Sequence, residues 1–143
     1  MRQLLAVAAI ALLAGQAAAG TIEVRDAWIR STPPGAPTAA GYATLINHGP
    51  ATDRLVDGHT SVAASVTPHT MSMAGGVMRM RPVAGGLPIA ASATLRLAPS
   101  GDHLMLLGLK HPLTAGQHVR VTLNFTRAGP ITTDFVVRDA AGM

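Results

Sequence analysis

The stretch Val121-Thr122-Leu123-Asn124-Phe125-Thr126 decides the class of fold. Its apolar residues alternate with polar ones. Because successive side chains of a β-strand point to opposite faces, this alternation predicts a strand with one buried and one solvated face. The following segment, residues 132–138, is rich in the β-branched and aromatic residues that strands favour.

Similar segments recur along most of the chain, and turn-forming residues separate them. The turn signals fall at residues 33–37, 47–50, 85–86, 99–101 and 128–130. Further strands are expected at residues 22–30, 41–47, 54–60, 64–69, 77–82, 93–97 and 104–109. Many short strands at this spacing predict one all-β domain, a sandwich or barrel.

The first 19 of the 143 residues have the pattern of a secretory signal peptide. Arg2 supplies the positive charge, residues 4–13 form an apolar core, and Ala17-Ala18-Ala19 fits the small-residue cleavage rule. The alternative is an uncleaved anchor, although the apolar stretch is short for a membrane span. We therefore expect an exported domain over residues 20–143. It has no cysteine and hence no disulfide.

Composition argues against two functional classes. The net charge is +4, the basic residues are scattered, and only four aromatic residues occur, so nucleic-acid binding is not expected. No Ser/His/Asp arrangement, paired carboxylates or phosphate-binding glycine loop is evident, so the chain is not expected to be an enzyme.

Methionine placement is the strongest compositional signal. Apart from the first and last residues, every methionine lies between positions 71 and 105. These are Met71, Met73, Met78, Met80 and Met105. Each alone could fill a gap in a β core. Their clustering beside His69 and His103 favours a metal site instead.

Strand geometry selects the candidate ligands. On a strand, His103 and Met105 project from the same face, which suits a two-ligand clamp. His69 ends an earlier strand, and Met80 follows it after ten intervening residues. The proposed ligands are therefore His69, Met80, His103 and Met105, with Met78 as a possible substitute for Met80.

Two nearby features are expected to have supporting roles. Met71 and Met73 are expected on a loop, as transient ligands or as an apolar rim for a partner. Asp102 could orient the His103 ring by accepting a hydrogen bond from the nitrogen that does not bind the metal, or could simply be exposed. The remaining histidines stand beside turn or solvated residues and are interpreted as surface groups. They are His48, His59, His111 and His118.

The ligand chemistry selects the metal. Imidazole and thioether are neutral, and thioether is soft, so together they suit Cu(I). Zinc sites usually include cysteine or carboxylate, and calcium requires several oxygens. A blue-copper electron carrier needs a cysteine thiolate, which this chain lacks.

These residues resemble a known family, the PCu(A)C-type periplasmic copper chaperones that supply the CuA centre of cytochrome c oxidase. The shared pattern is His-x10-Met followed by His-x-Met. Similar segments run along nearly the whole chain after residue 19. They are Trp28-Ile29-Arg30, residues 41–47, residues 53–56, residues 77–83 and residues 101–109.

The resemblance implies a cupredoxin-like Greek-key β-sandwich or barrel that binds Cu(I) through His69, Met80, His103 and Met105. It also implies a periplasmic location. The expected partner is the copper-site subunit of cytochrome c oxidase or another copper chaperone. The gap from Met80 to His103 is one residue longer than usual, and the chain lacks the His/Met-rich C-terminal tail of some members. We expect a monomer without stable membrane insertion once the signal peptide is removed.

Two other functions remain open at this stage. The protein could buffer copper or confer copper resistance without a dedicated acceptor. Alternatively, it could be a metal-free β-sandwich interaction module whose methionines form an apolar contact patch.

Overall fold

The computed structural model describes residues 21–139, and this part of the chain contains ten β-strands and no helix. The strands are β1 (Ile22–Arg30), β2 (Thr38–Asn47), β3 (Asp53–Thr60), β4 (Ala63–Ala74), β5 (Val77–Pro82), β6 (Leu87–Ile89), β7 (Thr94–Leu97), β8 (His103–Leu109), β9 (His118–Phe125) and β10 (Gly129–Arg138). Most expected strands are therefore confirmed. The signal peptide predicted for residues 1–19 lies outside the described residues.

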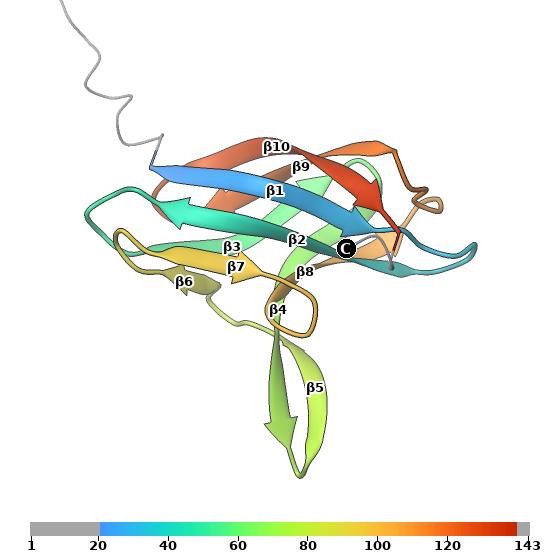
Figure 1. The fold of residues 1–143 in the computed structure, drawn as a ribbon, viewed down its shortest axis with the longest axis horizontal. Coiled ribbons are helices and arrows are strands. Elements are labelled where there is room, and N and C mark those ends of the chain that lie inside the picture. Colours follow the sequence, from blue (N-terminus) through green and yellow to red (C-terminus); the bar gives the residue numbers. More distant parts are fainter. Residues whose placement is uncertain (1–20, 140–143) are drawn as a thin grey trace, which may run out of the picture.

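Seven of the strands close into a barrel (Figure 1). The order around the ring is β4-β8-β2-β1-β10-β9-β3, and β3 returns to β4 where Gly58 pairs with Val66. β1 and β10 run parallel, whereas the other pairs are antiparallel. The remaining strands, β5, β6 and β7, attach outside the ring to β4, β3 and β2. The predicted all-β, cupredoxin-like fold is confirmed.

The barrel interior is filled by the apolar residues of the alternating strands. On β9, Val121, Leu123 and Phe125 are buried as the alternation predicts. Phe135 from the neighbouring β10 is fully buried beside them. Burying each such side chain contributes about 1.5–3 kcal/mol, so this seam is a main source of stability.

One strand is longer than expected, and it changes the shape of the molecule. β4 was predicted to end at His69 with a methionine-rich loop after it, but it continues to Ala74. It then turns through Gly75 and Gly76, whose φ angles of 60° and 80° suit the two-residue turn of a tight hairpin. The prediction failed because the segment Thr70–Met73 pairs with β5 rather than running free. The resulting β4–β5 hairpin projects from the barrel (Figure 1).

The structure also adds the short strand β6, which the sequence pattern did not indicate because Pro88 interrupts it. Within residues 21–139 there is no helix long and apolar enough to cross a membrane.

Candidate metal site

Two histidines predicted from the sequence lie directly opposite each other where the hairpin leaves the barrel. His69 on β4 pairs in register with His103, the first residue of β8. Their rings are stacked, with centroids 5.8 Å apart and planes inclined by 17°. The sheet thus brings together two imidazoles that are 34 positions apart in the chain, and both side chains leave the same face.

Hydrogen bonding prepares both imidazoles as ligands. His103 Nδ1 lies 3.0 Å from the carbonyl oxygen of Gly101, and His69 Nδ1 lies 3.3 Å from that of Thr67. A carbonyl only accepts, so in the neutral imidazole each Nδ1 carries the proton and each Nε2 presents its lone pair. A backbone carbonyl on the second nitrogen is the usual arrangement behind a metal-bound histidine.

The Nε2 atom of His103 is a buried polar atom whose hydrogen bonding is unsatisfied within the described part of the chain. His103 is only 5% exposed, and its Nε2 has no hydrogen-bond partner among the described residues. An unsatisfied buried polar atom costs about 1–3 kcal/mol. A bound metal ion would remove that cost, so this atom fits a ligand role better than a structural one. Any ion held here would be bound at a buried imidazole on the side of His103.

Met105 belongs to the same face as the histidines. It is paired with Thr67 across β4 and β8, next to the His69–His103 pair, and its side chain is partly buried. Leu104 and Leu106 point the other way and are at most 1% exposed. The predicted alternation of β8 is confirmed, with His103 and Met105 on one face and Leu104 and Leu106 on the core face.

Met80 lies farther from the pair. On β5 it is opposite Met71, and its neighbour on that face, Pro82, is opposite His69. A diagonal position of this kind separates Cβ atoms by about 7 Å, within reach of a long side chain. Met80 is 50% exposed, and β5 is two strand spacings from β8, or about 9–10 Å. The sheet thus gathers His69, His103 and Met105, while Met80 stands one strand beyond on the hairpin.

Asp102 has neither of the roles suggested for it. Its Oδ1 atom accepts a hydrogen bond of 2.6 Å from Thr70 Oγ1, whereas the partner of His103 is the Gly101 carbonyl. It therefore ties the start of β8 to β4 and is neither free nor directed at the imidazole.

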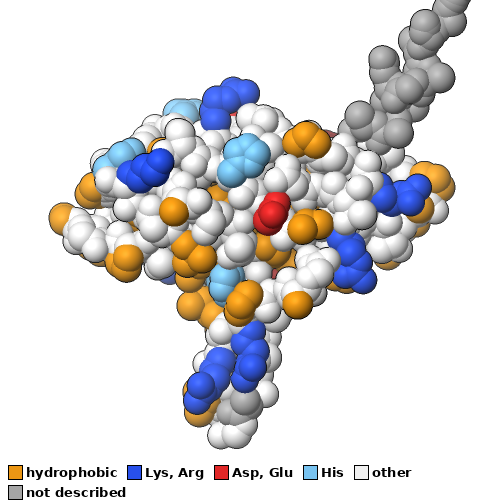
Figure 2. Space-filling view, turned by 180° about the vertical axis from the view of Figure 1, so that it is seen from behind, with side chains coloured by type: hydrophobic (Ala, Val, Ile, Leu, Met, Phe, Trp, Pro, Cys, Tyr) orange, Lys and Arg blue, Asp and Glu red, His pale blue; other side chains and the backbone are white. Residues whose placement is uncertain are grey.

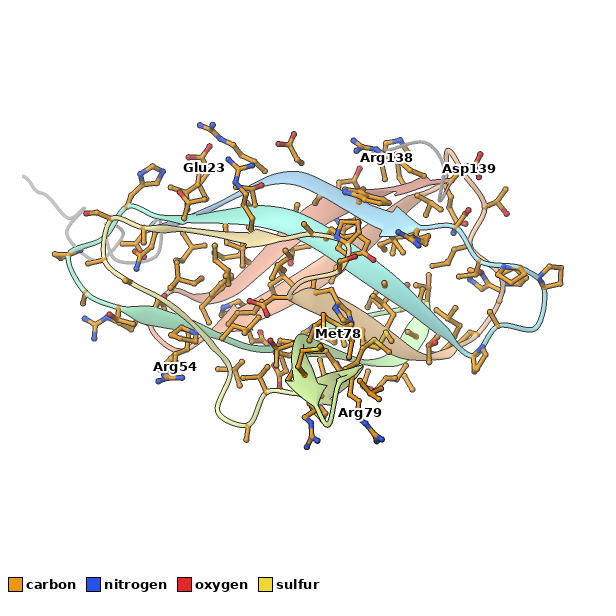
Figure 3. All side chains as sticks on the ribbon, turned by 60° about the horizontal axis from the view of Figure 1, so that its bottom comes forward. Glu23, Arg54, Met78, Arg79, Arg138 and Asp139 are labelled. Carbon is orange, nitrogen blue, oxygen red and sulfur yellow. The ribbon has the colours of Figure 1, made fainter. Side chains whose placement is uncertain are left out.

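Aromatic residues that the sequence analysis did not assign to the site cover His103. The Tyr42 ring lies 6.4 Å from the His103 ring, and Trp28 lies 4.7 Å from Tyr42. The guanidinium of Arg138, which Figure 3 labels, lies 5.7 Å from the centroid of the Trp28 ring. All are held by β1, β2 and β10, and Tyr42 is 6% exposed. The signal that could have found them is that Trp28 and Tyr42 are the chain's only tryptophan and tyrosine.

The other histidines are surface groups, as predicted. His48 and His118 pair with Glu23 and Asp134, and both pairs are exposed. The hydrogen bond from His48, and then that from Arg25, lower the pKa of Glu23. Within residues 21–139, no three His, Asp or Glu side chains converge as a metal site. On the face shared by the two histidines, Met71 lies two residues after His69 on β4 and Met105 lies two residues after His103 on β8.

Comparison with known proteins places the chain in a family. The family model described as "Putative lipoprotein LpqE-like" matches residues 22–137, which include every strand of the ring except the last residue of β10. The chain belongs to the LpqE-like family. A relative of this LpqE-like chain, described as "Putative lipoprotein Lxx21020" from Leifsonia xyli, is 35% identical over 121 residues, which is 85% of this chain and 72% of the relative.

Solved structures with the same fold include PCuAC domains. The copper-bound PCuAC domain of PmoF2 superposes with a TM-score of 0.71 at 23% identity, covering 84% of this chain and 94% of that domain. The Cu(I) form of DR1885 from Deinococcus radiodurans has a TM-score of 0.66 at 32% identity, covering 90% and 87%. The resemblance of this LpqE-like protein to the PCu(A)C-type domains, stated from its sequence, is confirmed.

Proposed function

We propose that this protein is a periplasmic copper chaperone that carries Cu(I) between proteins. His69, Met80, His103 and Met105 would hold the ion. The observation that carries the proposal is the stacked His69–His103 pair with both Nε2 lone pairs free, one of them buried without a partner. The copper-bound relatives of the same fold support it.

The ligands differ in accessibility, and this difference suits a carrier. His103 is buried and fixed by its hydrogen bond, so it needs little reorganisation to bind. Met80 is half exposed on the projecting hairpin and closes the site by turning toward His69. An acceptor would displace Met80 first and the histidines last. This order keeps Cu(I) ligated throughout the transfer.

Export is part of the proposal. Residues 1–19 would direct the chain out of the cytoplasm, and residues 20–143 would form the copper-binding domain. Lipoprotein descriptions among the relatives support an exported protein. The proposed acceptor is the copper-site subunit of cytochrome c oxidase or another chaperone. The carrier would act as a monomer and without enzymatic chemistry.

Competition for Cu(I) against a chelator of known affinity tests the site. His69→Ala and Met105→Ala should each weaken Cu(I) binding at least tenfold, and Met80→Ala should weaken it less because Met80 is half exposed. His118→Ala is the matched control, since this imidazole is paired with Asp134 on the surface. If the three ligand variants bind Cu(I) as tightly as His118→Ala and wild type, the ligand assignment is refuted.

Delivery is tested in cells that lack the protein. A delivery role predicts low cytochrome c oxidase activity that added copper restores. Copper sensitivity with normal oxidase activity would contradict delivery and would favour buffering.

A further inference from the structure

The β4–β5 hairpin carries four methionines in two directly opposed pairs. Met71 pairs with Met80, and Met73 pairs with Met78. Opposed residues of antiparallel strands share a face, and so do residues two apart on one strand. All four thioethers therefore leave the same face of the hairpin.

Core packing does not explain Met73, Met78 and Met80. Met73 is 65% exposed, and Met78 and Met80 are 50% exposed. The space-filling view shows the hairpin standing clear of the barrel, with Lys or Arg side chains along it (Figure 2). Exposed apolar side chains that fill no gap call for another role, because solvent contact brings them no stabilisation.

The Gly75-Gly76 turn determines which methionines of the hairpin face each other. Gly75 and Gly76 both have positive φ, and an added Cβ at either would meet no atom within 4 Å. Such a two-residue turn fixes the register of the strands that it joins. The opposition of Met73 to Met78 and of Met71 to Met80 follows directly from that register.

The spacing fits one metal ion. Four Cβ atoms in this arrangement form a rectangle of about 5 Å by about 7 Å, with its centre about 4 Å from each corner. A methionine sulfur lies two bonds beyond Cβ on a flexible chain, so several sulfurs can meet above that centre.

The charged residues of β5 leave the other face. Arg79 and Arg81 oppose Ser72 and Thr70, and both alternate with the methionines along the strand. Figure 3 labels Met78 beside Arg79, whose side chain extends outward from the hairpin. Within residues 21–139 neither arginine forms an ion pair. The methionine face thus offers neutral soft ligands, which select Cu(I) over hard divalent ions.

We propose a second Cu(I) site on the hairpin, made by Met71, Met73 and Met78, with Met80 at its junction with the histidine site. The proposal goes beyond the carrier function, because it stands on the hairpin residues whether or not His69 and His103 bind copper. Where both sites bind, Met80 is a ligand common to the two. An ion captured at the tip then reaches the histidines by exchange of neutral ligands, without entering water.

Cu(I) titration of protein labelled with 13C at the methionine methyl groups tests the second site under anaerobic conditions. Wild type should bind two equivalents, with the Met73 and Met78 signals shifting for one and the Met105 signal for the other. Met73→Leu/Met78→Leu keeps the apolar volume but removes two sulfurs. It should bind one equivalent and keep the Met105 shift. Val77→Leu, on the arginine face, is the control and should bind two.

The outcomes separate this proposal from the carrier function. If wild type binds one equivalent, and only the Met105 signal moves, the hairpin site is refuted while the histidine site stands. If His69→Ala/His103→Ala still binds one equivalent that shifts Met73 and Met78, the hairpin site is supported independently of the histidines. Unchanged stoichiometry in the Met73→Leu/Met78→Leu variant would also overturn it.

Discussion

His103 is well placed to bind a metal ion, but its burial is unfavourable in the metal-free protein. Its Nδ1 atom is tied to the Gly101 carbonyl, while its buried Nε2 has no partner among the residues described. The His-x-Met spacing predicted that His103 and Met105 share a face, because alternation on a strand is a local property. The burial under Tyr42 could not be predicted, since it depends on pairing between β2 and β8.

Replacing His103 should therefore separate binding from stability. Without copper, the free energy of unfolding of His103→Leu should equal that of wild type or exceed it by about 1 kcal/mol, because a buried polar atom without a hydrogen bond is removed. The same variant should lose at least tenfold in Cu(I) affinity. Urea denaturation and chelator competition measure the two quantities. A marked loss of stability would assign His103 a structural role instead.

Asp53 contrasts with His103, because it is a buried polar residue whose two carboxylate oxygens both accept hydrogen bonds. It is 2% exposed and accepts hydrogen bonds from the backbone N–H groups of Arg54, Arg127 and Ala128. Asp53→Ala should destabilise the protein by about 2–4 kcal/mol, since hydrogen bonds to a charged group are strong and their donors would be left unpaired.

Chemical denaturation checks this value against Asp57→Ala, which removes an exposed carboxylate bonded to Asn124 and should change stability by less than about 0.5 kcal/mol. Equal effects of the two substitutions would show that Asp53 is not a structural anchor.

At the scale of the element, the β4–β5 hairpin is where sequence and structure differ most. Period-two patterns and turn residues predicted the barrel strands within a few residues. They failed for residues 70–74, which were assigned to a loop although Thr70-Met71-Ser72-Met73 alternates, because the pairing of this segment with β5 depends on a hairpin register that alternation alone does not give. The sequence pattern and the resemblance both named Met80 as a ligand, but its place two strands away from His103 follows only from the register.

The glycine turn gives a test of the hairpin's role in binding. Gly75→Ala/Gly76→Ala places side chains at two positive φ angles, which should cost about 1–2 kcal/mol per residue and loosen the register. We expect Cu(I) affinity to fall several-fold, because Met80 is displaced. Gly35→Ala is the matched control, with a φ of 82° and open space around the added Cβ, but far from the site. If both variants bind copper like wild type, the hairpin does not hold the ion.

At the scale of the molecule, the barrel is a rigid support and copper is a ligand of the folded state. The strands β4 and β8 that bear the histidines belong to the closed ring, whereas β5 lies outside it. The unfolded chain has no preformed site, so binding should add to the free energy of unfolding. The all-β class was predictable because alternation is repeated in many segments, but ring closure by a parallel β1–β10 pair is not visible in any one of them.

Cu(I) held at 100 times its dissociation constant should raise the free energy of unfolding by about 2.7 kcal/mol. Denaturation of wild type with and without copper measures the change, and His69→Ala/Met105→Ala should show much less of it. Equal stabilisation of the variant would place the stabilising ion elsewhere.

The most direct measurement is a crystal structure of the Cu(I)-loaded protein with anomalous diffraction recorded at the copper edge. The proposed site predicts an anomalous peak in contact with His69 Nε2, His103 Nε2 and Met105 Sδ, with Met80 Sδ turned in from the hairpin. A loaded crystal in which no copper contacts His69 and His103 would contradict it.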